Sequence, residues 1–510
     1  MDDGSFRMRH FPILSAKQTG VLLVVTVAIC ISNLVFADSK FVNNARLPND
    51  VKPSCTANIA PWFGGTVTAN GWVEPANGLN PIFSDFKNNT RCDFYKWGAQ
   101  MFLWLTSGKE NYHVFNNSPE FYNVSVETNG KRTFLSGDGT IVLGVRKSKT
   151  DEEIELGQAG GSEVLISQGE SLVYYGIHVN NIYALYTTGK SIKKAAKGLS
   201  DHFPSTKDEV QAVSKFAKNY GYQIRDIRPM VIELKTSWVD ASTVPDPNEY
   251  VISQAVVPEF DRSKPKGPWP VTGNVTKTLA LVGMHVVGTV DGHPEMIWST
   301  FEHANNVPDN SYTYTSANDK TESQTYNSSG GWNFIKSNLP RPKSITANGK
   351  IDSANSNTSL ANSIVNIGDA KIGPVDVFRV APWGNDQSNS CGAITDNNTD
   401  LASINSSVLS QLKGGDIRGN YIQTGGIWTA EGQIPPGFPT TSPTYLRGSL
   451  SLSNSTMETY YQFYNNSSSF NPINCFGCHG GVHGATSSNP VSNPTFVSHI
   501  FEDMEPLPER

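Results

Sequence analysis

The sequence of 510 residues has little of several features that define large classes of protein. Beyond residue 37 no run of 18 apolar residues occurs, so we expect no transmembrane span there. Charged residues make up only 17% of the chain and the net charge is −6, without a basic run, so nucleic acid is not expected as a partner. At 510 residues the chain is too long to be a small disulfide-stapled scaffold. A phosphate-binding glycine loop, a dinucleotide fingerprint and a nucleophile elbow are all missing.

The N-terminus carries the pattern of a secretory signal peptide. An apolar run at 21–31 follows three basic residues and precedes compact residues that end at Ala37. The run is short for the roughly 20 residues that span a bilayer, so we predict cleavage after Ala37 rather than a membrane anchor. Cys30 leaves a lipoprotein open, although the bulky Ile29 before it argues against one. The mature protein is therefore expected to be periplasmic or secreted.

Periodicity predicts an α+β fold with a sheet-rich body and peripheral helices. Apolar positions recur at helical spacing over 92–105, and a helix start at 205–208 leads into a second apolar face that ends at Gly221. A further helix is expected over 453–464. Alternation or apolar runs predict strands over 140–145, 172–186, 231–239, 279–290 and 296–301.

We divide the chain into a signal peptide (1–37), a mixed body (38–450) and a C-terminal segment (451–510). Within the body, the Asn- and Ser-rich stretches 305–330 and 344–410 are interpreted as long surface loops that carry short elements. No internal repeat is visible.

Residues 475–479 carry the strongest chemical signal, Cys475-Phe476-Gly477-Cys478-His479. Cys-X-X-Cys-His is the pattern of covalent haem attachment, because two thiols reach the vinyl groups at one edge of a porphyrin while the next imidazole meets the iron. With only 6 Cys and 10 His in the chain, a chance occurrence is improbable. We therefore predict one covalent haem c, with thioethers to Cys475 and Cys478 and with His479 as an axial iron ligand.

The second axial position has several candidates. His499 follows His479 by 20 residues, in a short apolar segment that can fold back over a haem. Met504 is a weaker alternative, and an upstream histidine or an open position is also compatible. A His/Met pair raises the reduction potential, whereas an open iron permits ligand or substrate chemistry.

Two other interpretations of the motif stay open. A zinc site made of Cys475, Cys478, His483 and His499 fits a tetrahedral shell of two sulfurs and two nitrogens. A redox-active Cys-X-X-Cys disulfide needs a thioredoxin-like setting, which the Gly- and Asn-rich flanks do not indicate.

Three cysteines lie outside both the signal peptide and the motif. Cys55, Cys92 and Cys391 can supply one disulfide and one spare thiol in an oxidising compartment. Three pairings are possible, and the sequence does not choose among them.

A second cluster contains His285, His293 and His303, with carboxylates nearby. Histidines and carboxylates build metal sites and acid/base sites, but this spacing fits no ligand pattern. The alternative is a strand-turn-strand in which these histidines pack and bond to the backbone. A substrate pocket beside them is kept as a hypothesis.

Several stretches together resemble secreted bacterial c-type cytochrome-domain proteins. They are CDFYKWGAQMFLWLTS at 92–107, GMHVVGTV at 283–290, HPEMIWSTFEHANN at 293–306, STMETYYQ at 455–462, CFGCH at 475–479 and VSHIF at 497–501. The resemblance implies a large non-cytochrome body with one haem near the C-terminus, and electron transfer in the periplasm. Only 31 residues follow His479, too few for the usual downstream helices and Met ligand, so upstream sequence is expected to pack part of the haem.

The sequence thus predicts a periplasmic cytochrome that passes single electrons to or from a redox partner protein. One alternative is a haem oxidoreductase, with chemistry at an open iron or in a pocket near His285, His293 and His303. Another, from a different class, is a zinc-stabilised binding protein without a redox role.

Overall fold

The computed structural model describes most of the chain beyond residue 45. The described ranges are 46–79, 91–109, 112–125, 130–138, 140–142, 164–192, 198–341, 357–360, 363–366, 371–384, 391–434, 446–459, 475–480 and 494–510. They all belong to one compact unit, Val42–Arg510. The predicted signal peptide lies outside the described residues, and the boundary at residue 451 stays a prediction.

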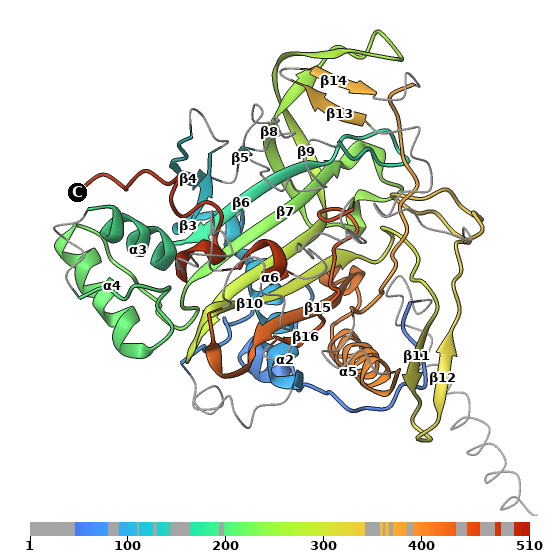
Figure 1. The fold of residues 1–510 in the computed structure, drawn as a ribbon, viewed down its shortest axis with the longest axis horizontal. Coiled ribbons are helices and arrows are strands. Elements are labelled where there is room, and N and C mark those ends of the chain that lie inside the picture. Colours follow the sequence, from blue (N-terminus) through green and yellow to red (C-terminus); the bar gives the residue numbers. More distant parts are fainter. Residues whose placement is uncertain are drawn as a thin grey trace, which may run out of the picture. The chain divides into compact units, whose positions relative to one another are not determined.

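A 12-stranded sheet forms the centre of the described structure (Figure 1). Its main path is β16-β15-β10-β9-β7-β6-β3-β4, with β8 and β14 paired to β9, β5 to β8 and β13 to β14. Neighbours are antiparallel except β5 and β8. The strands are β3 (Asn117–Val124), β4 (Phe134–Asp138), β5 (Thr140–Val142), β6 (Tyr174–Asn180), β7 (Ile232–Asp240), β8 (Ile252–Phe260), β9 (Trp269–Val290), β10 (His293–His303), β13 (Asn357–Leu360), β14 (Ser363–Asn366), β15 (Tyr421–Thr429) and β16 (Leu446–Gly448). The α+β class is confirmed.

Smaller elements surround this sheet. Four helices of 11 residues or more lie in the described part: α2 (Arg91–Leu105), α3 (Asn181–Ser191), α4 (Lys207–Asn219) and α5 (Cys391–Leu409). A single turn, α6, covers Cys475–Cys478. Two short hairpins pair β1 (Gly108–Lys109) with β2 (Tyr112–His113) and β11 (Tyr312–Thr315) with β12 (Thr321–Gln324). The 3-10 turns are Ala60–Phe63, Val114–Asn116, Ala241–Thr243, Pro247–Glu249, Ile417–Asn420, Ala430–Gly432 and Pro494–Val497.

The sheet is covered on both faces. Side chains of β10 alternate, so Phe301 points to one face and Trp298 and Thr300 to the other. Phe301 stacks on Phe102 of α2 with ring centroids 4.3 Å apart, and α5 packs beside α2 on that face. Trp298 belongs to an apolar cluster with α3, α4 and the C-terminal segment. Burial on both faces explains why β9 reads as an almost continuous apolar run from Leu279 to Val290.

Two predicted helices are confirmed by their local chemistry. The apolar positions of α2 are buried, including Trp97 and Trp104. Helix α4 begins with a capping box, in which the Thr206 side chain accepts from the Glu209 backbone and the Glu209 carboxylate accepts from the Thr206 backbone. The chain leaves α4 at Gly221, whose φ of +87° favours glycine.

The structure also chooses one cysteine pairing. Cys55 and Cys92 form a disulfide with Cα atoms 5.3 Å apart, which ties the N-terminal segment to the start of α2. The hydroxyl of Ser403, on α5, bonds the Cys55 backbone at both its N–H and its carbonyl. The disulfide therefore lies where the first segment meets both helices of this face.

Three predicted elements are wrong in part. The strand expected over 172–186 ends at Asn180, whose side chain accepts from the Tyr183 backbone and begins α3. Residues 453–459 form turns rather than a helix, and 460–464 lie outside the described residues. The loop expected over 344–410 contains the 19-residue helix α5. Its polar composition concealed it, because side chains such as Asn405 bond the backbone of the adjacent strand β15.

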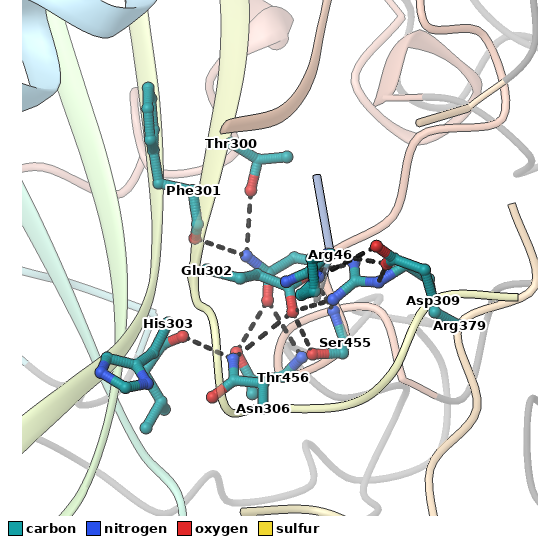
Figure 2. A network of polar contacts seen from close by, with 12 residues as sticks. Arg46, Thr300, Phe301, Glu302, His303, Asn306, Asp309, Arg379, Ser455 and Thr456 are labelled. Atoms are coloured by element: carbon teal, nitrogen blue, oxygen red, sulfur yellow. Dashed lines mark hydrogen bonds and ion pairs between the residues drawn. The ribbon is translucent and has the colours of Figure 1, made fainter. Parts of the chain in front are cut away.

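A network of buried charges lies at the end of β10 (Figure 2). Arg379 donates two hydrogen bonds to the Glu302 carboxylate, at 2.6 and 2.5 Å, and its Nε lies 2.9 Å from Asp309. Arg46 donates two more to Asp309, at 2.9 and 2.7 Å. Ser455 donates to Glu302 from its backbone at 2.8 Å and from its hydroxyl. Two cations thus balance two anions, which is the condition for burying charge at tolerable cost.

This network makes the free energy of unfolding depend on pH in the acid range. Burial alone raises the pKa of Glu302, but Arg379, Arg46 and the hydrogen bond from Ser455 together outweigh burial and lower that pKa from 4.5 to about 2. A carboxylate whose pKa falls on folding stabilises the folded state above the unfolded pKa. That contribution is lost as the pH falls from 4.5 toward about 2.

We expect Glu302→Gln to destabilise the protein at neutral pH by about 3–5 kcal/mol, because Arg379 loses its main buried counter-ion. The free energy of unfolding of the variant should also vary less with pH between 4.5 and about 2 than that of the wild type. Urea titrations at a series of pH values measure both effects. Glu322→Gln, which changes an exposed carboxylate on β12, is the matched control. An unchanged pH slope in Glu302→Gln would contradict the assignment.

Candidate functional site

The predicted haem motif forms a helical turn that is anchored in the apolar cluster. In α6, the His479 backbone N–H donates to the Cys475 carbonyl at 2.8 Å, so Cys475 and His479 lie on one side of the turn. Phe476 is 6% exposed and packs in the cluster that also contains Val497 and Met504. The Cys478 side chain and His483 lie outside the described residues.

The His479 ring is held in one orientation and one tautomer. Its Nδ1 lies 3.1 Å from the carbonyl oxygen of Val497. A carbonyl only accepts, so Nδ1 carries the proton and Nε2 keeps its lone pair. The indole of Trp298 packs on the ring with centroids 4.2 Å apart. Burial lowers the pKa of His479 well below its ordinary 6.5, and the neighbouring His499 and Lys235 lower it further. His479 is therefore a neutral imidazole with an available nitrogen ligand atom.

His499 comes back to the motif, as its position in the sequence predicts. Its ring stacks on His479 with centroids 3.8 Å apart and planes 13° from parallel, and the residue is exposed. His479 and His499 would hold one haem iron together only if the two rings separated from this stack, because stacked rings do not direct both nitrogens at one atom. The role of His499 as sixth ligand stays a prediction.

Met504, the weaker candidate, is 3% exposed inside the apolar cluster. Its backbone bridges to Arg132, and the flanking backbone groups of Asp503 and Glu505 bond the same residue. These backbone contacts hold the segment beside Arg132. The Met504 side chain is buried in the apolar cluster and contributes to the core.

Of the three upstream histidines, His285 lies next to the motif. A narrow cavity of about 10 Å³ is lined by His285, Trp298, Thr300, Glu458 and Cys475, with Ser299, Leu452 and Ser453. His285 contacts Glu458 through Nε2 at 2.9 Å and the Thr300 hydroxyl through Nδ1 at 2.8 Å. Asn454 donates to the same hydroxyl at 2.9 Å. A hydrogen-bonded chain thus runs from Asn454 through Thr300 and His285 to Glu458.

The other two histidines pack in different surroundings. His303 stacks on Tyr250 at 3.8 Å, accepts from the Asn305 backbone and donates to the Glu249 carbonyl, and burial lowers its pKa to about 3. His293 bonds Glu295 at 2.6 Å and meets the Phe94 ring edge to face. The structure therefore separates the predicted cluster, and only His285 reaches the cavity beside Cys475.

Two carboxylates near the motif have shifted proton affinities. Burial would raise the pKa of Glu458, but His285, Lys235 and a hydrogen bond from the Asn454 backbone together outweigh burial, and the net shift of the pKa is downward. Burial raises the pKa of Glu233 to about 7, which a hydrogen bond with Ser498 opposes in part. Ser498 lies one residue before His499, and its hydroxyl is 2.7 Å from that of Tyr183.

Sequence reasoning missed the neighbours that complete this site. Trp298 and Thr300 are two residues apart in a predicted strand. This spacing places both side chains on the same face of the sheet, and it was the only signal in the sequence that linked them. Glu458 and Val497 carry no local signal in the sequence. Glu458 contacts His285, which lies 173 residues earlier, and Val497 contacts His479, which lies 18 residues earlier.

Comparison with known protein families, curated proteins and solved structures finds no match to this chain. Within the described residues, no helix is long and apolar enough to cross a membrane. The same residues contain no group of three His, Cys, Asp or Glu side chains placed to hold a metal ion. The zinc alternative needs Cys478 and His483, so it stays untested.

We expect Trp298→Ala to lower the free energy of unfolding by about 3–5 kcal/mol, because it removes the surface on which Phe476 and His479 pack. The segments around 475–480 and 494–510 should also be cut faster in limited proteolysis. Trp72→Ala, at a position that is 40% exposed, should change stability by less than about 1 kcal/mol. Similar effects of the two substitutions would contradict the packing role of Trp298.

Proposed function

We propose that the protein is a periplasmic c-type cytochrome that carries one covalent haem and transfers single electrons. Cys475 and Cys478 would form the thioethers, and His479 would bind the iron. The observation that supports this most is the Val497 carbonyl at Nδ1 of His479, because such a partner fixes the tautomer and leaves Nε2 as the ligand atom. When bound, the haem would supply reversible one-electron chemistry.

The described groups around the motif are compatible with a haem. His479 is neutral and faces an aromatic wall formed by Trp298, and Phe476 anchors the turn in the core. The cavity beside Cys475 is too small to enclose a porphyrin, so the fit rests on the ligand atoms and their orientation. The Cys55–Cys92 disulfide supports export, because such bonds persist in oxidising compartments.

A haem oxidoreductase is the second candidate, and one observation favours it. The chain from Thr300 through His285 to Glu458 lines the same cavity as Cys475. An imidazole between a hydroxyl and a carboxylate can accept and return a proton, which an electron carrier does not require. His285 would then move the proton that accompanies substrate chemistry.

We expect the protein, expressed with its N-terminal segment in a host that matures cytochromes c, to show a sharp reduced α-band and to keep haem stain after denaturation. Cys475→Ala combined with Cys478→Ala should abolish covalent haem, because both thioethers are lost. Cys391→Ala is the matched control and should keep it. Intact mass and zinc content complete the measurement.

Absence of an added tetrapyrrole, while a control cytochrome acquires its own, would contradict the proposal. A colourless protein with stoichiometric zinc would instead support the zinc-stabilised binding protein.

A second experiment addresses the sixth ligand. If His499 binds the iron, His499→Ala should convert a low-spin spectrum to a high-spin one, because an axial nitrogen is removed. His202→Ala, at a partly exposed histidine beside Glu209, is the control and should leave the spectrum unchanged. An unchanged spectrum in His499→Ala would exclude it as ligand. A high-spin wild-type spectrum that responds to peroxide would favour the oxidoreductase.

A further inference from the structure

A second cavity, of about 220 Å³, lies apart from the motif and shares no lining residue with the cavity beside Cys475. It is formed by strand β3, the first turns of α3, the segment that follows α4, and Arg510. The side chains that matter are Tyr122, Asn181, Tyr222, Arg225 and Arg510. This volume is below the range of about 300–1,000 Å³ that is typical of sites for drug-sized molecules, so the cavity suits a smaller ligand.

Two polar groups that line this cavity lack hydrogen-bond partners within the described part of the chain. Asn181 is 9% exposed and Tyr122 is 3% exposed, and both line the cavity. Neither the Asn181 amide nor the Tyr122 hydroxyl forms a hydrogen bond with another described residue. The Asn181 amide and the Tyr122 hydroxyl are therefore available to form hydrogen bonds with a molecule in the cavity.

Two exposed arginine side chains line the cavity, although the protein has a negative net charge of −6. Arg225 forms no ion pair with another described residue. Arg510 is held over the Tyr222 ring, with its Cζ 4.4 Å from the centroid, and the Tyr222 hydroxyl donates to the Pro508 carbonyl at 2.7 Å. A fixed guanidinium and an unpaired one make an anion the complementary ligand.

The start of α3 adds partial positive charge beside the two arginine side chains. Asn181 is the first residue of the 11-residue helix, and the preceding Asn180 accepts from the Tyr183 backbone. The first backbone N–H groups of a helix have no partner within it, and the aligned peptide dipoles place partial positive charge there. Asn181 therefore presents an uncharged amide where the helix itself favours an anion.

We infer that this cavity binds a small organic anion through a carboxylate or phosphate group. Arg225 and Arg510 would bind the charged group, and Asn181 and Tyr122 would donate hydrogen bonds to it. Guanidinium groups match both oxyanions in a bidentate manner, so the two chemistries share one site. The inference does not depend on the haem, so either can fail without the other.

Isothermal titration calorimetry of the full mature protein with inorganic phosphate and with succinate tests the inference. We expect saturable, salt-sensitive binding of at least one of them, and the tighter of the two identifies the charged group. Arg225→Gln should weaken binding by about tenfold or more, because it removes a charge-assisted hydrogen bond. Arg341→Gln makes the same charge change at an exposed arginine outside the lining, and it should leave affinity within about twofold.

A third variant separates binding from folding. Asn181→Asp places a carboxylate against Arg225 and Arg510, at a helix start that favours acidic residues, so thermal stability should be equal or higher. Binding of both probes should be lost, because the new carboxylate occupies the anion position. Absence of saturable binding in the wild type up to about 10 mM would overturn the inference. Equal weakening by Arg225→Gln and Arg341→Gln, or unchanged binding in Asn181→Asp, would overturn it as well.

Discussion

Four buried charged side chains determine how distant parts of the chain meet at the end of β10. Glu302 and Asp309 follow one another closely, whereas Arg46 and Arg379 come from segments hundreds of residues apart (Figure 2). Removing any one of them leaves an unpaired charge in a low-dielectric interior, which is strongly destabilising. These segments therefore depend on one another for their positions. Ser455 adds the C-terminal segment to the same anchor through Glu302.

This anchor explains the position of the candidate site. Once Ser455 is held at Glu302, Asn454 and Glu458 lie beside Thr300 and His285 on the same face of β9 and β10. The next residues of β10 on that face lead to Trp298, on which the motif turn packs. The motif therefore rests on rigid strands instead of loops, which favours precise orientation of its ligand atoms.

The two faces of the sheet have different chemistry. The face under α2 and α5 is closed by aromatic stacking and by the Cys55–Cys92 disulfide. The opposite face carries the motif, the chain from Thr300 to Glu458, and α3, whose first turn borders the cavity lined by the two arginines. A redox centre and an anion site on one face would let the charge of a bound anion act on the energetics of electron transfer through the protein.

The sequence alone was enough for features set by neighbours within a few residues. Apolar periodicity with capping chemistry predicted α2 and α4, and the spacing from Cys475 to His479 predicts haem attachment. Tertiary structure decided the rest. It selected Cys55 and Cys92 as a pair, stacked His499 on His479, separated His285 from His293 and His303, and turned the polar stretch 391–409 into a buried helix. Each of these outcomes depends on contacts between residues far apart in the chain, and local pattern carries no information about which distant groups the fold brings together.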